Sequence, residues 1–153
     1  MAPVRVYFDC MVYDKIASDD VILAAIQAGI RDGRMKVRAS IKLAEQLQRS
    51  PFGGVPDWFE VEVIPELLTV ADQTYVDHSF FTDTGIFELH HGESTQDGNI
   101  EDAIIAESAS GGADIFVTED KRSLQPSRVR LMRCRVMTFE AFCVWLRRSA
   151  RQV

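Results

Sequence analysis

The sequence has few of the features that define several large classes of protein. Its three cysteines have no metal-site spacing and are odd in number, so we expect reduced thiols in a cytoplasmic protein. No window approaches the roughly 18 uninterrupted apolar residues of a membrane span. Asp9 and Asp14 interrupt what would be the apolar region of a signal peptide, which argues against one. These absences predict a protein without a membrane partner.

Acidic residues are almost missing from the end of the chain. Residues 121–153 contain 9 Lys or Arg and a single acid, Glu140, whereas residues 1–120 contain 8 Lys or Arg and 22 Asp or Glu. The net charge of −6 argues against binding duplex DNA through charge alone. An acidic body could hold cations and a basic tail could meet phosphates, or the two could simply pair with each other.

The length and the lack of internal repeats, low-complexity tracts and long linkers predict one domain, residues 1–153. Apolar and β-branched runs predict strands, and amphipathic runs predict helices between them. Strands are expected at residues 4–8, 35–40, 59–65 and 114–118, and residues 128–132 and 134–137 could form another. Helices are expected at residues 18–33, 41–49, 66–78, 99–113 and 138–150. This alternation predicts an α/β domain on a mostly parallel central sheet flanked by helices.

The expected caps and breakers of these helices are particular residues. Ser18 is expected to cap the helix at residues 18–33 and Gly33 to end it, and Thr138 is expected to cap the last helix. Asn99 and the pair Gly111-Gly112 are expected to begin and end the helix between them. These positions set the direction of each helix against the sheet.

Two aspartates follow two of the predicted strands. Asp9 comes directly after the strand at residues 4–8, and Asp120 comes just after the strand at residues 114–118. Ligand sites in open parallel sheets lie beyond the carboxyl ends of the strands, so the two acids are expected to converge. The neighbouring Glu119 is expected to point the other way, because side chains alternate along an extended chain.

Two further acids could join this edge. Asp102 lies in the first turn of the helix at residues 99–113, whose N-terminus faces the same edge because helix and strand run antiparallel. Alternatively, Asp102 only stabilises its own helix, because a negative charge in the first turn interacts favourably with the helix dipole. Glu45 borders the apolar face of the helix at residues 41–49 and is either a fourth member or a solvated residue. Crowded carboxylates need a cation, and oxygen ligands suit Mg²⁺ or Mn²⁺.

Four segments together carry a resemblance to a known family. "VYFDC" at 6–10, "IKLAEQL" at 41–47, "EDAIIAESA" at 101–109 and "ADIFVTEDKRSL" at 113–124 resemble the successive motifs of the PIN-domain family. That family is largely one of metal-dependent ribonucleases, including the VapC-type toxins of bacterial toxin–antitoxin pairs. The resemblance implies a three-layer fold, an RNA substrate and Mg²⁺ or Mn²⁺ as cofactor. An antitoxin protein and a second copy of the chain are the protein partners it allows.

The resemblance also assigns roles to residues. It implies that Asp9, Glu45, Asp102 and Asp120 form the catalytic cluster, with Asp9, Asp102 and Asp120 as metal ligands. It places Thr118 where the family commonly has a hydroxyl that helps to orient the site. Arg122, Arg128 and Arg130 in the basic tail are candidate phosphate contacts.

Several residues bear on functions other than that of a ribonuclease. Cys10 and Met11 stand where many members of the family carry a hydroxyl residue and Asn, which favours the alternative of an inactive PIN-like interaction module. A haloacid-dehalogenase-like phosphatase would need an acid where Met11 stands. Adjacent His90 and His91 lack a spaced third ligand for zinc. No His stands beside Cys134 or Cys143 to activate a thiol nucleophile.

Overall fold

A computed structural model describes residues 2–64, 105–106, 109, 111–126 and 132–151 of the chain. Its elements follow each other in the order β1 (Val4–Phe8), α1 (Cys10–Ala17), α2 (Asp20–Arg31), β2 (Met35–Ser40), α3 (Ile41–Gln48), β3 (Val61–Ile64), β4 (Ile115–Val117), β5 (Arg135–Met137) and α10 (Phe139–Arg151).

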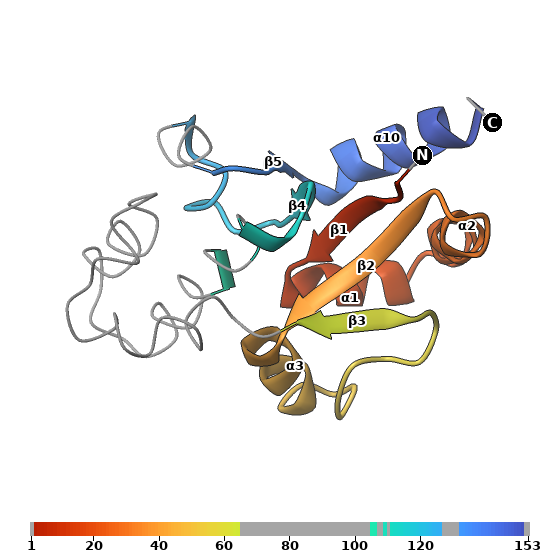
Figure 1. Cartoon of the computed structure of the whole chain (residues 1–153). Coiled ribbons are helices and arrows are strands. Elements are labelled where there is room, and N and C mark those ends of the chain that lie inside the picture. The colour runs from red at the N-terminus through yellow and green to blue at the C-terminus, as the bar shows by residue number, and fades with distance from the viewer. Residues whose placement is uncertain (1, 65–104, 107–108, 110, 127–131, 152–153) are drawn as a thin grey trace.

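The five strands form one sheet in the order β3-β2-β1-β4-β5 (Figure 1). Every neighbouring pair is parallel, with Val6 of β1 opposite Val37 of β2 and Ile115 of β4. The expected α/β domain with a mostly parallel sheet is confirmed. Because all five strands run the same way, their carboxyl ends meet at one edge of the sheet.

Helices α1 and α10 cover one face of the sheet. The ring of Phe8, on β1, makes edge-to-face contacts with Tyr13 of α1 and Phe142 of α10, with ring centroids 5.9 and 5.1 Å apart. Helix α2 packs against both α1 and α10. All three aromatic side chains are completely buried, so this aromatic cluster fixes the helices that flank the central strand.

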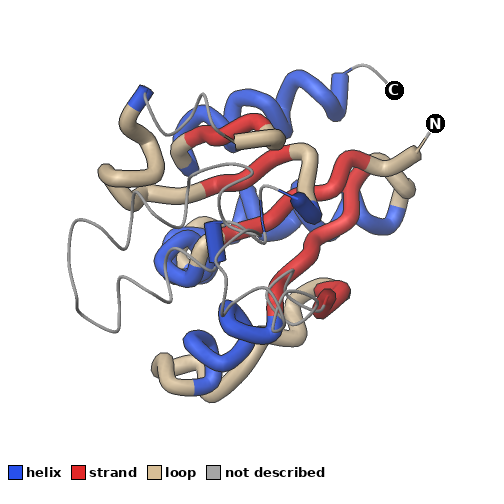
Figure 2. The backbone as a smooth tube through the Cα atoms, turned by 60° about the vertical axis from the view of Figure 1, so that its left-hand side comes forward, coloured by secondary structure: helices blue, strands red, loops and turns tan. Residues whose placement is uncertain are grey.

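The opposite face of β1 carries Tyr7, whose ring contacts Phe116 of β4 at 5.8 Å between centroids. On this face Nη1 of Arg38, in β2, donates a hydrogen bond to the carbonyl oxygen of Gly112 over 3.1 Å. Gly112 is helical, as are the buried residues Ile105 and Ala109. Helical residues therefore lie on both faces, and the fold has three layers, with the strands in the middle (Figure 2).

The chain between β1 and α2 differs from the expectation of one helix capped by Ser18. A separate helix, α1, begins directly after β1. Ser18 ends α1, where its hydroxyl donates to the carbonyl of Asp14, and Asp19 caps α2 by accepting from the N–H of Ile22 over 3.1 Å. The Ser18 prediction was wrong because the carboxylate one residue later reaches the free N–H groups of α2.

The other predicted helix ends had mixed outcomes. Gly33 does follow the end of α2, with φ of 75°, a left-handed conformation that favours glycine. Thr138 does cap α10, since its Oγ1 accepts from the N–H of Ala141 over 3.1 Å. Gly111 and Gly112 are themselves helical, so the break comes at Ala113 rather than at the glycine pair. The expected helix at residues 66–78 and the expected cap Asn99 lie outside the described residues.

The structure bears on two expectations from the sequence, the state of the cysteines and the lack of a membrane-spanning segment. Cys10, Cys134 and Cys143 all lie in the described part of the chain, and all three are thiols rather than half-cystines. Within the described ranges, no helix has both the length and the apolar character needed to cross a bilayer.

Candidate active site

The backbone places Asp9 at the carboxyl edge of the sheet. Its N–H donates to the carbonyl of Val117 over 2.9 Å, which continues the pairing of β1 with β4 by one residue. Its carboxylate then caps α1, with Oδ1 accepting from the N–H of Cys10 over 2.8 Å. Asp9 is only 8% exposed. A helix N-terminus favours negative charge, and this cap holds the Asp9 side chain at the carboxyl edge.

Thr118 joins Asp9 to the segment that follows β4. Its hydroxyl donates to Oδ2 of Asp9 over 2.7 Å and accepts from the N–H of Asp120 over 3.0 Å. Thr118 is completely buried, and its own N–H donates to the carbonyl of Met137 in β5. The expected orienting hydroxyl therefore contacts one predicted acid and the backbone of another.

Asp120 lies in a tight turn that engages both of its carboxylate oxygens. Oδ1 accepts from the N–H of Arg122 over 3.1 Å and lies 3.5 Å from Nε of the same arginine. Oδ2 accepts from the hydroxyl of Ser123 over 3.1 Å. The side chain of Asp120 is 15% exposed. The structure thus brings the segments of Asp9, Thr118 and Asp120 together. Arg122, predicted from the sequence to contact phosphate, and Ser123, which the sequence did not indicate, are neighbours of Asp120.

Glu119 faces away from this cluster, as the alternation of side chains predicts. Its Oε1 accepts from the N–H of Phe139, the first residue of α10, over 3.0 Å. Glu119 therefore satisfies an otherwise unpaired donor at a helix N-terminus and adds a negative charge there. This role could not be predicted from the sequence, because Phe139 is 20 residues away along the chain.

Glu45 occupies the outward face of α3. Its side chain is 51% exposed and Oε2 pairs with Nζ of Lys42 over 3.4 Å, while Leu43 and Leu47 carry the buried face of the same helix. None of the contacts described for Glu45 reaches Asp9 or Asp120. The position matches the solvated alternative that the sequence left open for this residue.

Several predicted residues lie outside the described part of the chain. These are Asp102, Arg128 and Arg130, as well as His90 and His91 of the zinc alternative. Within the described ranges no three His, Cys, Asp or Glu side chains gather as a metal site. The described candidate is therefore two aspartates, Asp9 and Asp120, joined by the hydroxyl of Thr118, which contacts the carboxylate of Asp9 and the backbone N–H of Asp120.

The carboxylate oxygens of Asp9 and Asp120 are of the ligand type that suits a hard divalent cation. Both side chains offer only oxygen, the ligand type that Mg²⁺ and Mn²⁺ prefer. Both are largely buried at the edge of a sheet, where negative charge is costly unless it is compensated. Asp9 and Asp120 are the residues that would hold such an ion.

The remaining buried titratable groups do not supply a nucleophile. Burial raises the pKa of Cys134 to about 12 and also raises that of Cys143, so both thiols stay protonated and unreactive at neutral pH. Burial likewise raises the pKa of Tyr13, whose hydroxyl has no hydrogen-bond partner among the residues that the structure describes. By contrast, the hydroxyl of Tyr7 accepts from the N–H of Ser40 over 2.9 Å. These groups belong to the core rather than to a second reactive site.

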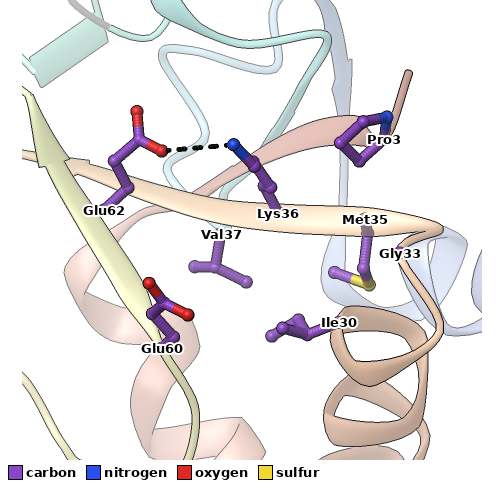
Figure 3. Close-up of a pocket in the computed structure, with 8 residues that line it drawn as sticks. All are labelled: Pro3, Ile30, Gly33, Met35, Lys36, Val37, Glu60 and Glu62. Carbon is purple, nitrogen blue, oxygen red and sulfur yellow. Dashed lines mark ion pairs between the residues drawn. The ribbon is translucent and has the colours of Figure 1, made fainter.

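A hollow of about 170 Å³ lies elsewhere on the molecule (Figure 3). Gly33, which precedes β2, and Glu60, which precedes β3, line it together with Ile30 and Met35. Residues that precede parallel strands mark the amino edge of the sheet, opposite Asp9. The ion pair drawn there joins Lys36 and Glu62 over 3.7 Å. The hollow is therefore separate from the acidic pair.

No protein-family model and no curated protein matches this chain. The resemblance to the PIN-domain family therefore stays a prediction from the four sequence motifs.

Proposed function

We propose that this chain is a PIN-like, metal-dependent endoribonuclease that hydrolyses phosphodiester bonds of RNA. The observation that carries the proposal is the hydrogen-bonded link from Asp9 through Thr118 to Asp120 at the carboxyl edge of a parallel sheet. The order of the four sequence motifs supports RNA as the substrate class. An antitoxin protein and a second copy of the chain are proposed as partners on the same ground.

The proposed mechanism assigns a task to each of these residues. Asp9 and Asp120 would hold Mg²⁺ or Mn²⁺, which would supply the charge that polarises water and offsets negative charge on the phosphate. Thr118 ties the Asp9 carboxylate to the backbone of Asp120, because its one hydroxyl contacts both. The N–H of Cys10 keeps the Asp9 carboxylate pointed at the edge. Positioning of this kind removes the entropy cost of assembling the site during the reaction.

The expected acid Asp102 would complete the cluster as a third ligand, and the basic residues Arg128 and Arg130 would contact phosphates. All three are proposals from the sequence. Arg122, the third candidate phosphate contact, pairs with Asp120 in this structure.

The test is cleavage of an RNA substrate with Mg²⁺ or Mn²⁺ and with a chelator. Asp120→Asn keeps the size of the side chain but removes the charge that a cation needs, so cleavage should fall by at least about 10²-fold. Glu119→Gln is the matched control at the adjacent position, and it should retain cleavage because Glu119 contacts α10. Equal losses in both variants, or cleavage that persists in chelator, would contradict the proposal.

A second candidate function is an inactive PIN-like module that binds another protein. It is favoured by Met11, a large apolar residue that is 41% exposed two positions after Asp9. Exposed apolar groups beside a polar edge suit a protein interface. The same assay separates the two functions, because an inactive module would show no metal-dependent cleavage in the unsubstituted protein.

A further inference from the structure

Asp120 already has a cation of its own. Nε of Arg122 lies 3.5 Å from Oδ1 of Asp120, and both side chains are largely buried, with 26% and 15% exposure. A charge pair that is partly shielded from water is screened less than one on an open surface. The guanidinium therefore places a positive charge beside the Asp120 carboxylate.

Two further contacts hold the same carboxylate without using the guanidinium. The backbone N–H of Arg122 donates to Oδ1, and the hydroxyl of Ser123 donates to Oδ2. These contacts are independent of the charge on Arg122, so the orientation of Asp120 should survive its loss. Of the contacts described for Asp120, only the ion pair with the guanidinium would be lost.

We propose that Arg122 is the resident counter-ion of Asp120 and that a divalent cation must displace its guanidinium to bind this carboxylate. The inference rests on the proposed function and deepens it, because it makes the Arg122–Asp120 pair set the metal concentration at which the site fills. The protein's monovalent cation and the divalent cation from solution compete for one oxygen, Oδ1 of Asp120. Two positive charges at one site repel each other, so either the guanidinium or the divalent cation contacts Oδ1, but not both at once.

The test is the affinity of the metal-free full chain for Mn²⁺, measured by titration calorimetry. Arg122→Gln should bind Mn²⁺ about threefold to tenfold more tightly than the unsubstituted protein, as expected for loss of a partly exposed competing charge. Arg122→Lys should fall between the two, because a lysine keeps the charge but not the planar guanidinium. Structural damage would weaken binding, so a gain in affinity reports on competition itself.

Arg135→Gln is the matched control for the loss of one positive charge. Arg135 is an exposed residue of the same basic tail, but it begins β5 and so lies at the amino edge of the sheet. Its substitution should leave Mn²⁺ affinity unchanged. In an Asp120→Asn background, Arg122→Gln should give no gain, because the two residues act on one contact.

The outcomes separate this inference from the proposed function. If the unsubstituted protein binds Mn²⁺ through Asp120 but Arg122→Gln binds equally or more weakly, the counter-ion role is overturned and the metal site stands. If neither protein binds Mn²⁺, the proposed metal site fails, and the inference fails with it. If Arg135→Gln tightens binding as much as Arg122→Gln, the effect is one of net charge, and the inference is again overturned.

Discussion

The hydroxyl of Thr118 lies 2.7 Å from Oδ2 of Asp9 and donates a hydrogen bond to it. Both residues are buried, and Thr118 is completely so. A buried carboxylate that loses a donor keeps its charge but has less to stabilise it. The relationship therefore links the integrity of the proposed site to the stability of the fold.

Thr118→Val should lower the free energy of unfolding by about 1–3 kcal/mol, because it removes a hydrogen bond to a buried carboxylate at nearly constant volume. Thr118→Ser keeps the hydroxyl and should cost much less. Urea unfolding of the metal-free protein measures both. A Thr118→Val protein as stable as the unsubstituted one would show that the contact contributes nothing.

Glu119→Ala should lower the free energy of unfolding by about 0.5–2 kcal/mol, since it leaves the N–H of Phe139 without its partner at the start of α10. Glu119→Gln retains an acceptor and loses only the charge beside the helix dipole, for a cost of about 0.3–1 kcal/mol. Chemical denaturation distinguishes the two. An alanine variant that unfolds at the same urea concentration as the unsubstituted protein would rule out this capping role.

The sequence predicted the parallel sheet because its strands carry a direct physical signal. Val6, Tyr7 and Phe8 are apolar in succession, and all three are completely buried between two helical layers. A continuous apolar run of this kind is typical of a central parallel strand. The same logic placed Asp9 and Asp120 at one edge, because both follow such runs.

Other features depended on geometry that the sequence does not carry. Helix α1 was missed because Asp9 both ends the strand segment and caps the helix, so no turn residues separate them. The pairing of Arg122 with Asp120 depends on the shape of one turn. The exposure of Glu45 depends on how far α3 rotates about its axis. Periodicity indicates a buried face of a helix but does not decide the contacts of residues at its border.

Tyr13→Phe should raise the free energy of unfolding by about 1 kcal/mol or more, because the Tyr13 hydroxyl is buried and no described residue pairs with it. Tyr7→Phe is the matched control and should destabilise by about 1–3 kcal/mol, because it leaves the buried N–H of Ser40 unpaired. Thermal and urea unfolding of the two variants provide the comparison. Destabilisation by Tyr13→Phe would mean that its hydroxyl has a partner in solution, such as a buried water molecule.

The pair Arg5–Asp114 should make stability depend on pH in the acid range. The hydrogen bond from Arg5 lowers the pKa of Asp114 below its usual value, and partial burial opposes this shift. A lowered folded-state pKa gives stability that is fully present above the unfolded value of about 3.9 and is lost as pH falls through the folded value. The effect should be modest, because the side chains are 41% and 45% exposed to screening water.

Asp114→Asn and Arg5→Gln each remove this contribution, so both should flatten the fall in stability below about pH 4 to a similar degree. Urea unfolding across a series from pH 6 to pH 2 gives the slopes. An unchanged slope in both variants would show that the pair does not contribute to acid unfolding.

The most direct test of the account is the effect of Mn²⁺ on thermal unfolding of the unsubstituted protein, Asp9→Asn and Asp120→Asn. Binding to the native state alone should stabilise the unsubstituted protein by about 2.7 kcal/mol at 100 times the dissociation constant, which raises Tm by roughly 5–10 °C for a domain of this size. Each variant should lose most of that rise while still folding without metal. A Tm that does not respond to Mn²⁺, or that rises equally in all three proteins, would contradict a metal site at Asp9 and Asp120.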